Sequence, residues 1–152
     1  MTSSSVASGA GSSLFSNKAF WLAVLANTVW INASEIFRYF VFVMPMMRDA
    51  FPGIDNIAPM NVAVFLSWGV WDTILVLVVT LSVWVVIDRF GTGFHTVLGA
   101  ATGLWLGIFT ILWLGLFNMN LATVGIMLLA LPLAWIEMAV AALIVRQFWK
   151  PV

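Results

Sequence analysis

Four long apolar stretches constrain this chain more than any other feature of its sequence. They cover roughly residues 18–44, 60–87, 94–117 and 121–145, and each is long enough to cross a hydrocarbon layer, which needs about 20 mostly apolar residues. Hydrophobic residues make up 63% of the chain and charged residues 8%, against about half and a quarter in soluble domains. The sequence therefore predicts an all-α, polytopic membrane protein with one transmembrane domain over residues 18–150.

The segments between these stretches contain the residues that usually end helices. Residues 45–59 include three prolines and a glycine, residues 88–93 include two glycines, and residues 118–120 read NMN, which predicts a tight hairpin. Two short connections favour antiparallel neighbours, hence a four-helix bundle. Residues 1–17 are rich in Ser, Ala and Gly, and we expect a flexible tail in which Ser16 or Asn17 caps the first helix.

The basic residues predict the orientation of the bundle. Four crossings put the N-terminus, the second connection and the C-terminus on one side, and that side holds Lys18, Arg89, Arg146 and Lys150. The opposite side holds only Arg48. Because Lys and Arg collect on the cytoplasmic side, we expect both termini in the cytoplasm and the protein in the cytoplasmic membrane, meaning an inner or plasma membrane.

Composition also excludes several kinds of site and partner. The chain has no cysteine, so thiolate, iron–sulfur and cysteine–zinc chemistry are excluded. Its single histidine, His95, cannot provide two axial ligands to a haem within one chain. The formal net charge is +0 and there is no basic run, so nucleic acid is not an expected partner. We predict no cofactor and no metal, and the lipid bilayer as the surrounding medium.

Four ionisable residues lie inside the apolar stretches. Glu35, Asp72 and Glu137 fall close to the middle of their segments, and Arg38 follows Glu35 by one helical turn. A charged side chain at mid-membrane costs roughly 2.5–3.5 kcal/mol on the most lenient scale, so we expect these four to face inward and meet. One guanidinium cannot neutralise three carboxylates, and at least one acid, with Glu137 the leading candidate, is expected to be neutral at pH 7.

Helical spacing gives an expected arrangement around these charges. On the first helix one stripe carries Thr28, Asn32, Glu35 and Tyr39, with Asn27, Ser34 and Arg38 to its side, while Trp30 and Ile31 face lipid or packing.

We predict that Arg38 lies between Glu35 and Asp72, because a guanidinium can bind one carboxylate in a bidentate manner and contact a second. Four further residues beside this group are candidates for substrate binding. They are Asn27, Asn32, Tyr39 and, on the face that carries Asp72, Trp68.

The third stretch carries Gly99, Gly103 and Gly107 at four-residue spacing. Such small residues allow a neighbouring helix to approach closely. We favour packing inside this bundle over a contact with a second copy or a partner helix, and both interpretations remain open. In the fourth stretch, Pro132 is expected to kink the helix and to free the carbonyl group of Leu128.

The buried charges admit two interpretations. They can fix which helix lies beside which, or they can form a site, which is the usual meaning of ionisable groups in a membrane. We favour the second: a mid-membrane site in which Glu35, Asp72 or Glu137 acts as acid or base on a lipophilic molecule, or in which Arg38 holds an anionic group. Isomerisation or cyclisation is the predicted reaction class, with a proton-coupled transporter or a non-enzymatic accessory subunit as alternatives.

Overall fold

The computed structural model describes residue 14 and residues 16–150, and this part of the chain contains helices and turns without a β-strand. The helical elements, with η marking π-helical segments, are α2 (Lys18–Arg38), η1 (Tyr39–Val43), α3 (Met44–Ala50), α4 (Val62–Phe90), α5 (Phe94–Leu104), η2 (Trp105–Thr110), α6 (Ile111–Asn118) and α7 (Val124–Phe148).

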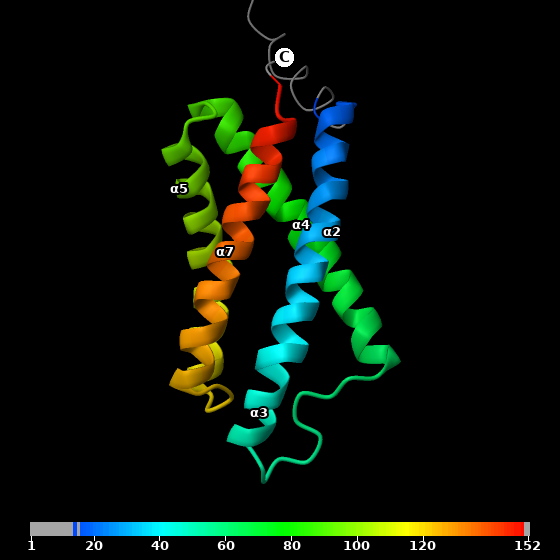
Figure 1. Ribbon diagram of the computed structural model, residues 1–152, viewed down its shortest axis with the longest axis vertical. Coiled ribbons are helices and arrows are strands. Elements are labelled where there is room, and N and C mark those ends of the chain that lie inside the picture. Colours follow the sequence, from blue (N-terminus) through cyan, green and yellow to red (C-terminus); the bar gives the residue numbers. More distant parts are fainter. Residues whose placement is uncertain (1–13, 15, 151–152) are drawn as a thin grey trace, which may run out of the picture.

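These elements form four antiparallel rods (Figure 1). The rods span Lys18–Ala50, Val62–Phe90, Phe94–Asn118 and Val124–Phe148, and all four are long and apolar enough to cross a membrane. The predicted all-α transmembrane bundle is therefore confirmed. The beginning of α2 and the end of α7 lie at the same end of the bundle.

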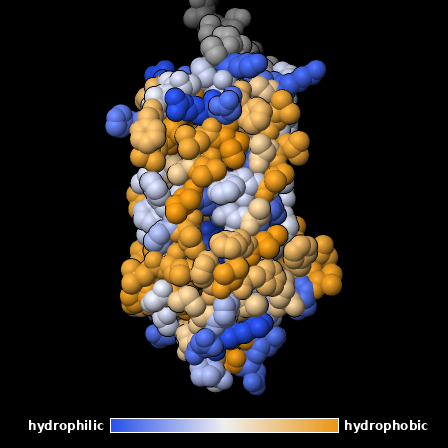
Figure 2. Space-filling view, in the orientation of Figure 1, coloured by the Kyte–Doolittle hydropathy of each residue, from blue (hydrophilic) through white to orange (hydrophobic). Residues whose placement is uncertain are grey.

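Hydrophobic residues cover most of the side of the bundle, and hydrophilic residues gather at its two ends (Figure 2). Many of the outward side chains are large and apolar, such as Leu25, Val29 and Leu66, which are each more than 60% exposed. A soluble protein rarely exposes so much contiguous apolar surface. This surface fits the hydrocarbon layer, and the protein is an integral membrane protein.

Polar caps set where the helices begin. The side chain of Asn17 accepts a hydrogen bond of 2.9 Å from the backbone N–H of Ala19, so the predicted cap of the first helix is confirmed. The predicted flexible tail lies, apart from its last residues, outside the described residues. Asn61 and Thr123 cap α4 and α7 in the same way, because an Asn or Thr side chain can satisfy an N–H of the first turn. These two helices therefore begin two or three residues later than predicted.

The first rod is longer than predicted. It was expected to stop near Pro45, yet helix continues to Ala50. The π-helical segment η1 explains the difference, since the N–H of Met44 bonds to the carbonyl of Tyr39, five residues earlier. Proline lacks an N–H and its ring collides with the carbonyl of the preceding turn of an α-helix. The wider π turn gives that ring room, and Pro45 then occupies the first turn of α3.

Helix α7 lies at the centre of the bundle and contacts α2, α4 and α5. Half of its buried residues are alanines, including Ala130, Ala134 and Ala141, which are all fully buried. Small side chains let helix axes approach closely in a membrane. The helix also passes through Pro132 without ending.

Two tryptophans join the third rod to α7. The indole Nε1 of Trp105 donates to the backbone carbonyl of Leu131 at 2.8 Å, and that of Trp135 donates to the hydroxyl of Thr102 at 3.1 Å. This bond lies next to Pro132, although the carbonyl that loses its helical N–H partner through the proline is that of Leu128, four residues before it. Deep tryptophans of this protein therefore bond across helices in addition to packing.

The glycine stripe does not pack inside the bundle, so the favoured interpretation of it is wrong. Gly99, Gly103 and Gly107 are exposed, and a Cβ atom at any of them would meet no neighbouring atom within 4 Å. Two of them, Gly99 and Gly103, line an outward groove of about 680 Å³ between α4 and α5. The rods that lie closest together are joined by the alanines of α7 instead.

Candidate functional site

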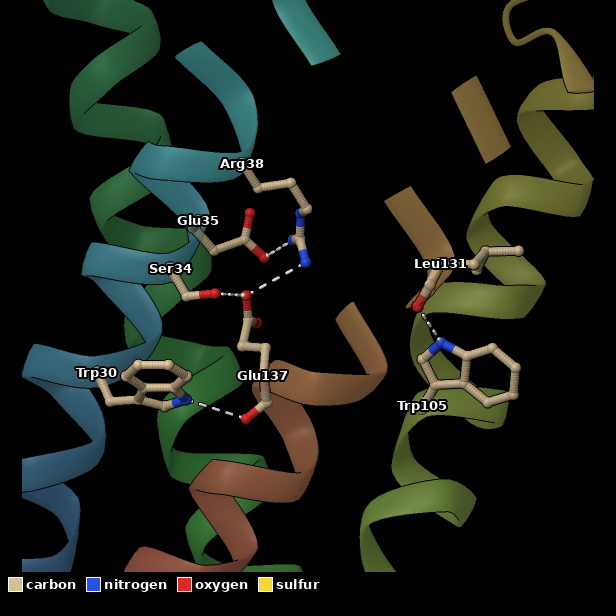
Figure 3. A network of polar contacts seen from close by, with 7 residues as sticks. All are labelled: Trp30, Ser34, Glu35, Arg38, Trp105, Leu131 and Glu137. Atoms are coloured by element: carbon tan, nitrogen blue, oxygen red, sulfur yellow. Dashed lines mark hydrogen bonds and ion pairs between the residues drawn. The ribbon is translucent and has the colours of Figure 1, made fainter. Parts of the chain in front are cut away.

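Arg38 forms the centre of a buried polar network (Figure 3). Its Nη2 pairs with Oε1 of Glu35, one turn earlier on the same rod, and its Nη1 lies 3.2 Å from Oε2 of Glu137 on α7. The second partner is therefore Glu137, and the predicted bridge from Arg38 to Asp72 is wrong. The guanidinium also lies over the ring of Phe109, 5.1 Å from its centre.

Glu137 is fully buried and is held by α2 through three residues. Ser34 Oγ donates to Glu137 Oε2 at 2.7 Å, beside the bond from Arg38. Trp30 Nε1 donates to the backbone carbonyl of Glu137 at 3.0 Å. The other carboxylate oxygen, Oε1, is buried and has no partner within the described ranges. Glu137 thus joins α7 to α2, with one oxygen well satisfied and the other not.

The inward face of α2 differs from the predicted one. Its buried residues are Phe20, Ala23, Asn27, Ile31 and Arg38. Trp30 and Ile31, for which lipid or packing is predicted, both pack inside the bundle, and Trp30 bonds to α7.

Ser34 was not among the predicted site residues. It lies one turn after Ile31 and one turn before Arg38, on the same face of the helix, and that spacing was the available signal.

Three of the predicted supporting residues form hydrogen bonds with groups outside the network. Asn27 donates to the hydroxyl of Thr80 on α4 at 3.0 Å. Asn32 donates to the carbonyl of Thr28 on its own helix at 2.9 Å, and the hydroxyl of Tyr39 lies 3.4 Å from the carbonyl of Pro59 in the loop. None of the three hydrogen bonds a carboxylate of the network.

A pocket of about 180 Å³ lies beside this network, lined by Glu35, Arg38, Tyr39, Val43, Trp68, Trp71, Asp72, Phe109, Leu112 and Trp113. These residues come from the α2–η1 rod, from the first third of α4 and from the η2–α6 segment. The structure thus brings Glu35, Arg38, Tyr39, Trp68 and Asp72 together around one cavity. It places Glu137 behind Arg38, outside the lining.

Asp72 differs from the other two acids. It is only 6% exposed, and among the described residues it makes neither a hydrogen bond nor an ion pair. An unpaired polar group in such a place is costly, and buried carboxylates nearly always have a partner. Asp72 therefore cannot be explained as a link between helices.

Aromatic rings form most of the remaining wall. The rings of Tyr39 and Trp68 meet edge to face, with their centres 4.4 Å apart and an angle of 78° between their planes. Trp71 and Trp113 complete the aromatic part of the lining beside Phe109. The cavity therefore combines apolar faces with one unpaired carboxylate, a combination that favours a ligand with an apolar body and a single polar or charged group.

Two further observations bear on the class of site. Within the described ranges no three His, Cys, Asp or Glu side chains gather as metal ligands would. The chain matches no protein-family model, and the comparisons found no similar curated protein and no similar solved structure.

Proposed function

We propose that this protein binds a small lipophilic molecule inside the membrane, in the pocket between the α2–η1 rod, α4 and η2–α6. The observation that carries the proposal is Asp72, a buried carboxylate that has no partner among residue 14 and residues 16–150 and that lines an aromatic cavity. An ionisable group at this depth is maintained at a cost to stability, as functional residues often are. The ion pairs of Arg38 support the pocket by fixing α7 against α2.

The size of the cavity limits what it can hold. Drug-sized ligands occupy pockets of about 300–1,000 Å³, whereas an engineered cavity of about 150 Å³ holds benzene. The present cavity, at about 180 Å³, belongs with the second class. The proposed ligand is therefore either a small molecule or one end group of a longer, lipid-like molecule.

A more specific version of the proposal is that the protein carries out acid–base chemistry on this ligand. Of the three acids, Glu35 and Asp72 line the pocket and Glu137 does not, so Asp72 replaces Glu137 as the leading acid or base. In its protonated form Asp72 could donate a proton to a lipophilic substrate, and the carboxylate left behind, together with the tryptophan faces, could stabilise the resulting cation. Isomerisation or cyclisation would use these two steps and would end when the cation returns a proton to the Asp72 carboxylate, which restores the acid.

Proton-coupled transport is less well supported, because a transporter needs a route from its site to each membrane surface. On the side of Asp72 that faces the termini, α4 continues with Val76, Val79, Thr80 and Val83, which are at most 1% exposed. This packing closes the direct route to that surface. A pocket closed toward this surface is a better basis for binding or catalysis than for transport.

A role as an accessory subunit has one observation in its favour. The exposed glycines of α5 and η2 leave room for the backbone of another helix, and such stripes are common contact faces between membrane helices. This second role does not compete with the pocket, because Gly99, Gly103 and Gly107 are not among the residues that line it.

The proposed location is a cytoplasmic membrane with both termini inside. Lys18, Arg89, Arg146 and Lys150 are all exposed, and they belong to the end of the bundle at which α2 begins and α7 ends (Figure 1). This distribution supports the orientation that basic residues usually indicate.

A neutral lipophile tests the binding function directly. Neopentylbenzene should raise the melting temperature of the purified protein in detergent, and Leu112→Trp should abolish the shift because the larger ring fills the pocket. Leu114→Trp is the matched control, since Leu114 is 53% exposed and outside the lining. Equal shifts in the two variants would place the probe elsewhere and overturn the proposal.

A further inference from the structure

We infer that the pocket takes an organic cation, a protonated amine or a quaternary ammonium group at the end of an apolar molecule, with Asp72 as its counter-ion. This inference rests on the proposed binding function and names the class of ligand. It follows from which charges of the network are already paired, which aromatic rings line the pocket, and where the pocket meets the lipid.

Arg38 is not free to bind an anion. Nη1 faces Glu137, Nη2 faces Glu35, and the guanidinium covers the ring of Phe109. An anionic group would have to displace a carboxylate that is already in place, and it would then lie beside Asp72 and Glu35. The structure therefore argues against the anionic group that the sequence suggested.

The acids around the pocket outnumber the positively charged groups. One guanidinium faces the carboxylates of Glu35 and Glu137, and Asp72 adds a third acid with no cation of its own. A charge in a low-dielectric environment is stable only when it is paired. A ligand with a single positive charge would supply the missing partner.

The aromatic wall is suited to the same ligand. With the face of Phe109 covered by Arg38, the rings of Tyr39, Trp68, Trp71 and Trp113 are left to line the cavity. Tryptophan faces attract cations more strongly than those of other residues, and several rings around one carboxylate resemble the cages that bind quaternary ammonium groups.

The exposure of the lining indicates how such a ligand would lie. Trp71 is 52% exposed and Leu112 37%, on the lipid-facing side, whereas Asp72 is 6% exposed. The cationic group would therefore lie at Asp72, and its apolar part would pass between Trp71 and Leu112 into the hydrocarbon. A cavity of about 180 Å³ has room for the charged end but not for a long tail.

Three probes of nearly the same shape test the inference: benzyltrimethylammonium, neopentylbenzene and benzylsulfonate, which present a cationic, a neutral and an anionic tetrahedral group. Binding is followed by tryptophan fluorescence in detergent, and Leu112→Trp serves as the blank for partition into micelles. We expect the cation to bind the wild type roughly tenfold more tightly than its neutral counterpart. Asp72→Asn should remove this preference, and Asp88→Asn, at the exposed end of α4, should keep it.

The outcomes separate the inference from the function on which it rests. If the cation and the neutral probe bind equally well, the pocket stands and the cationic ligand class is overturned. Tightest binding of benzylsulfonate would mean that Arg38 can release its carboxylates, which also overturns it. If no probe distinguishes the wild type from Leu112→Trp, the binding function itself fails.

Discussion

The indole nitrogen of Trp30 lies 3.0 Å from the backbone carbonyl oxygen of Glu137. Ser34 and Arg38, four and eight residues later on the same rod, bond the side chain of that glutamate. Residues four apart form one row on a helix. One row of side chains on α2 therefore bonds both the backbone carbonyl and the carboxylate of Glu137 on α7. This row fixes how far α7 can slide and rotate against α2.

Removing the indole donor should weaken this contact. Trp30→Phe keeps an aromatic ring but loses the N–H, and we expect it to lower the free energy of unfolding in detergent by about 0.6 kcal/mol, a typical value for a bond between membrane helices. Trp149→Phe is the control, because the indole N–H of Trp149 is buried without a partner in the described part of the chain. An equal loss in both variants would show that ring size, not the hydrogen bond, matters at Trp30.

Loss of Arg38 should be far more damaging. Arg38→Ala leaves Glu137 fully buried without its cation and Glu35 unpaired, and stranding a buried carboxylate costs about 3–5 kcal/mol. Arg48→Ala removes a charge of the same sign from an exposed position, where the guanidinium only contacts the carbonyl of Ala58 at 3.3 Å. Similar melting temperatures for the two variants in detergent would mean that the network contributes little to stability.

Neutralising Glu137 and neutralising Asp72 should affect the free energy of unfolding differently. Glu137→Gln exchanges an acceptor of two hydrogen bonds for an amide, and we expect a loss of about 1–3 kcal/mol in the free energy of unfolding. Asp72→Asn removes a carboxylate with no partner in the described ranges, so we expect stability within about 0.5 kcal/mol of the wild type, or above it. Thermal melts of both variants check this, and a marked loss in Asp72→Asn would assign that residue a structural role.

The orientation of the bundle can be tested because the chain contains no cysteine. Asp88→Cys and Asn118→Cys each introduce one thiol at an exposed position, at opposite ends of the bundle. If both termini are cytoplasmic, an impermeant maleimide applied to intact cells should label Asn118→Cys only, and lysis should be needed to label Asp88→Cys. The reverse pattern would invert the orientation that the basic residues predict.

The number of spans, their order and the caps at Asn17 and Gly91 follow from local properties of the sequence. Hydropathy over about 20 residues predicts a membrane span, whichever neighbours the helix packs against. Gly91, with φ +84, ends α4 in a conformation that other residues rarely adopt. Element type and number were therefore predictable, and so was the tight turn through Asn120.

The partner of Arg38 was not predictable in this way, because it depends on the rotation of α2 against its neighbours. The polar residues Thr28 and Asn32 lie on the stripe that the sequence predicts to face inward. Each instead bonds a carbonyl one turn earlier in its own helix, at 2.8 Å to Val24 and at 2.9 Å to Thr28. A polar side chain that is satisfied locally can face lipid, so polarity alone did not indicate which side of the helix meets the bundle.

The two π-helical segments, Tyr39–Val43 and Trp105–Thr110, decide which residues beyond them face the pocket. A π turn holds about one residue more than an α-helical turn. If the same residues formed an unbroken α-helix, everything beyond the π turn would be rotated by about 100°. In the first rod this rotation would carry Val43 out of the lining, and in the third it would do the same to Leu112 and Trp113. Two walls of the cavity thus depend on a local change in helical winding, and restoring the regular α-helix would reshape the pocket while leaving every side chain chemically intact.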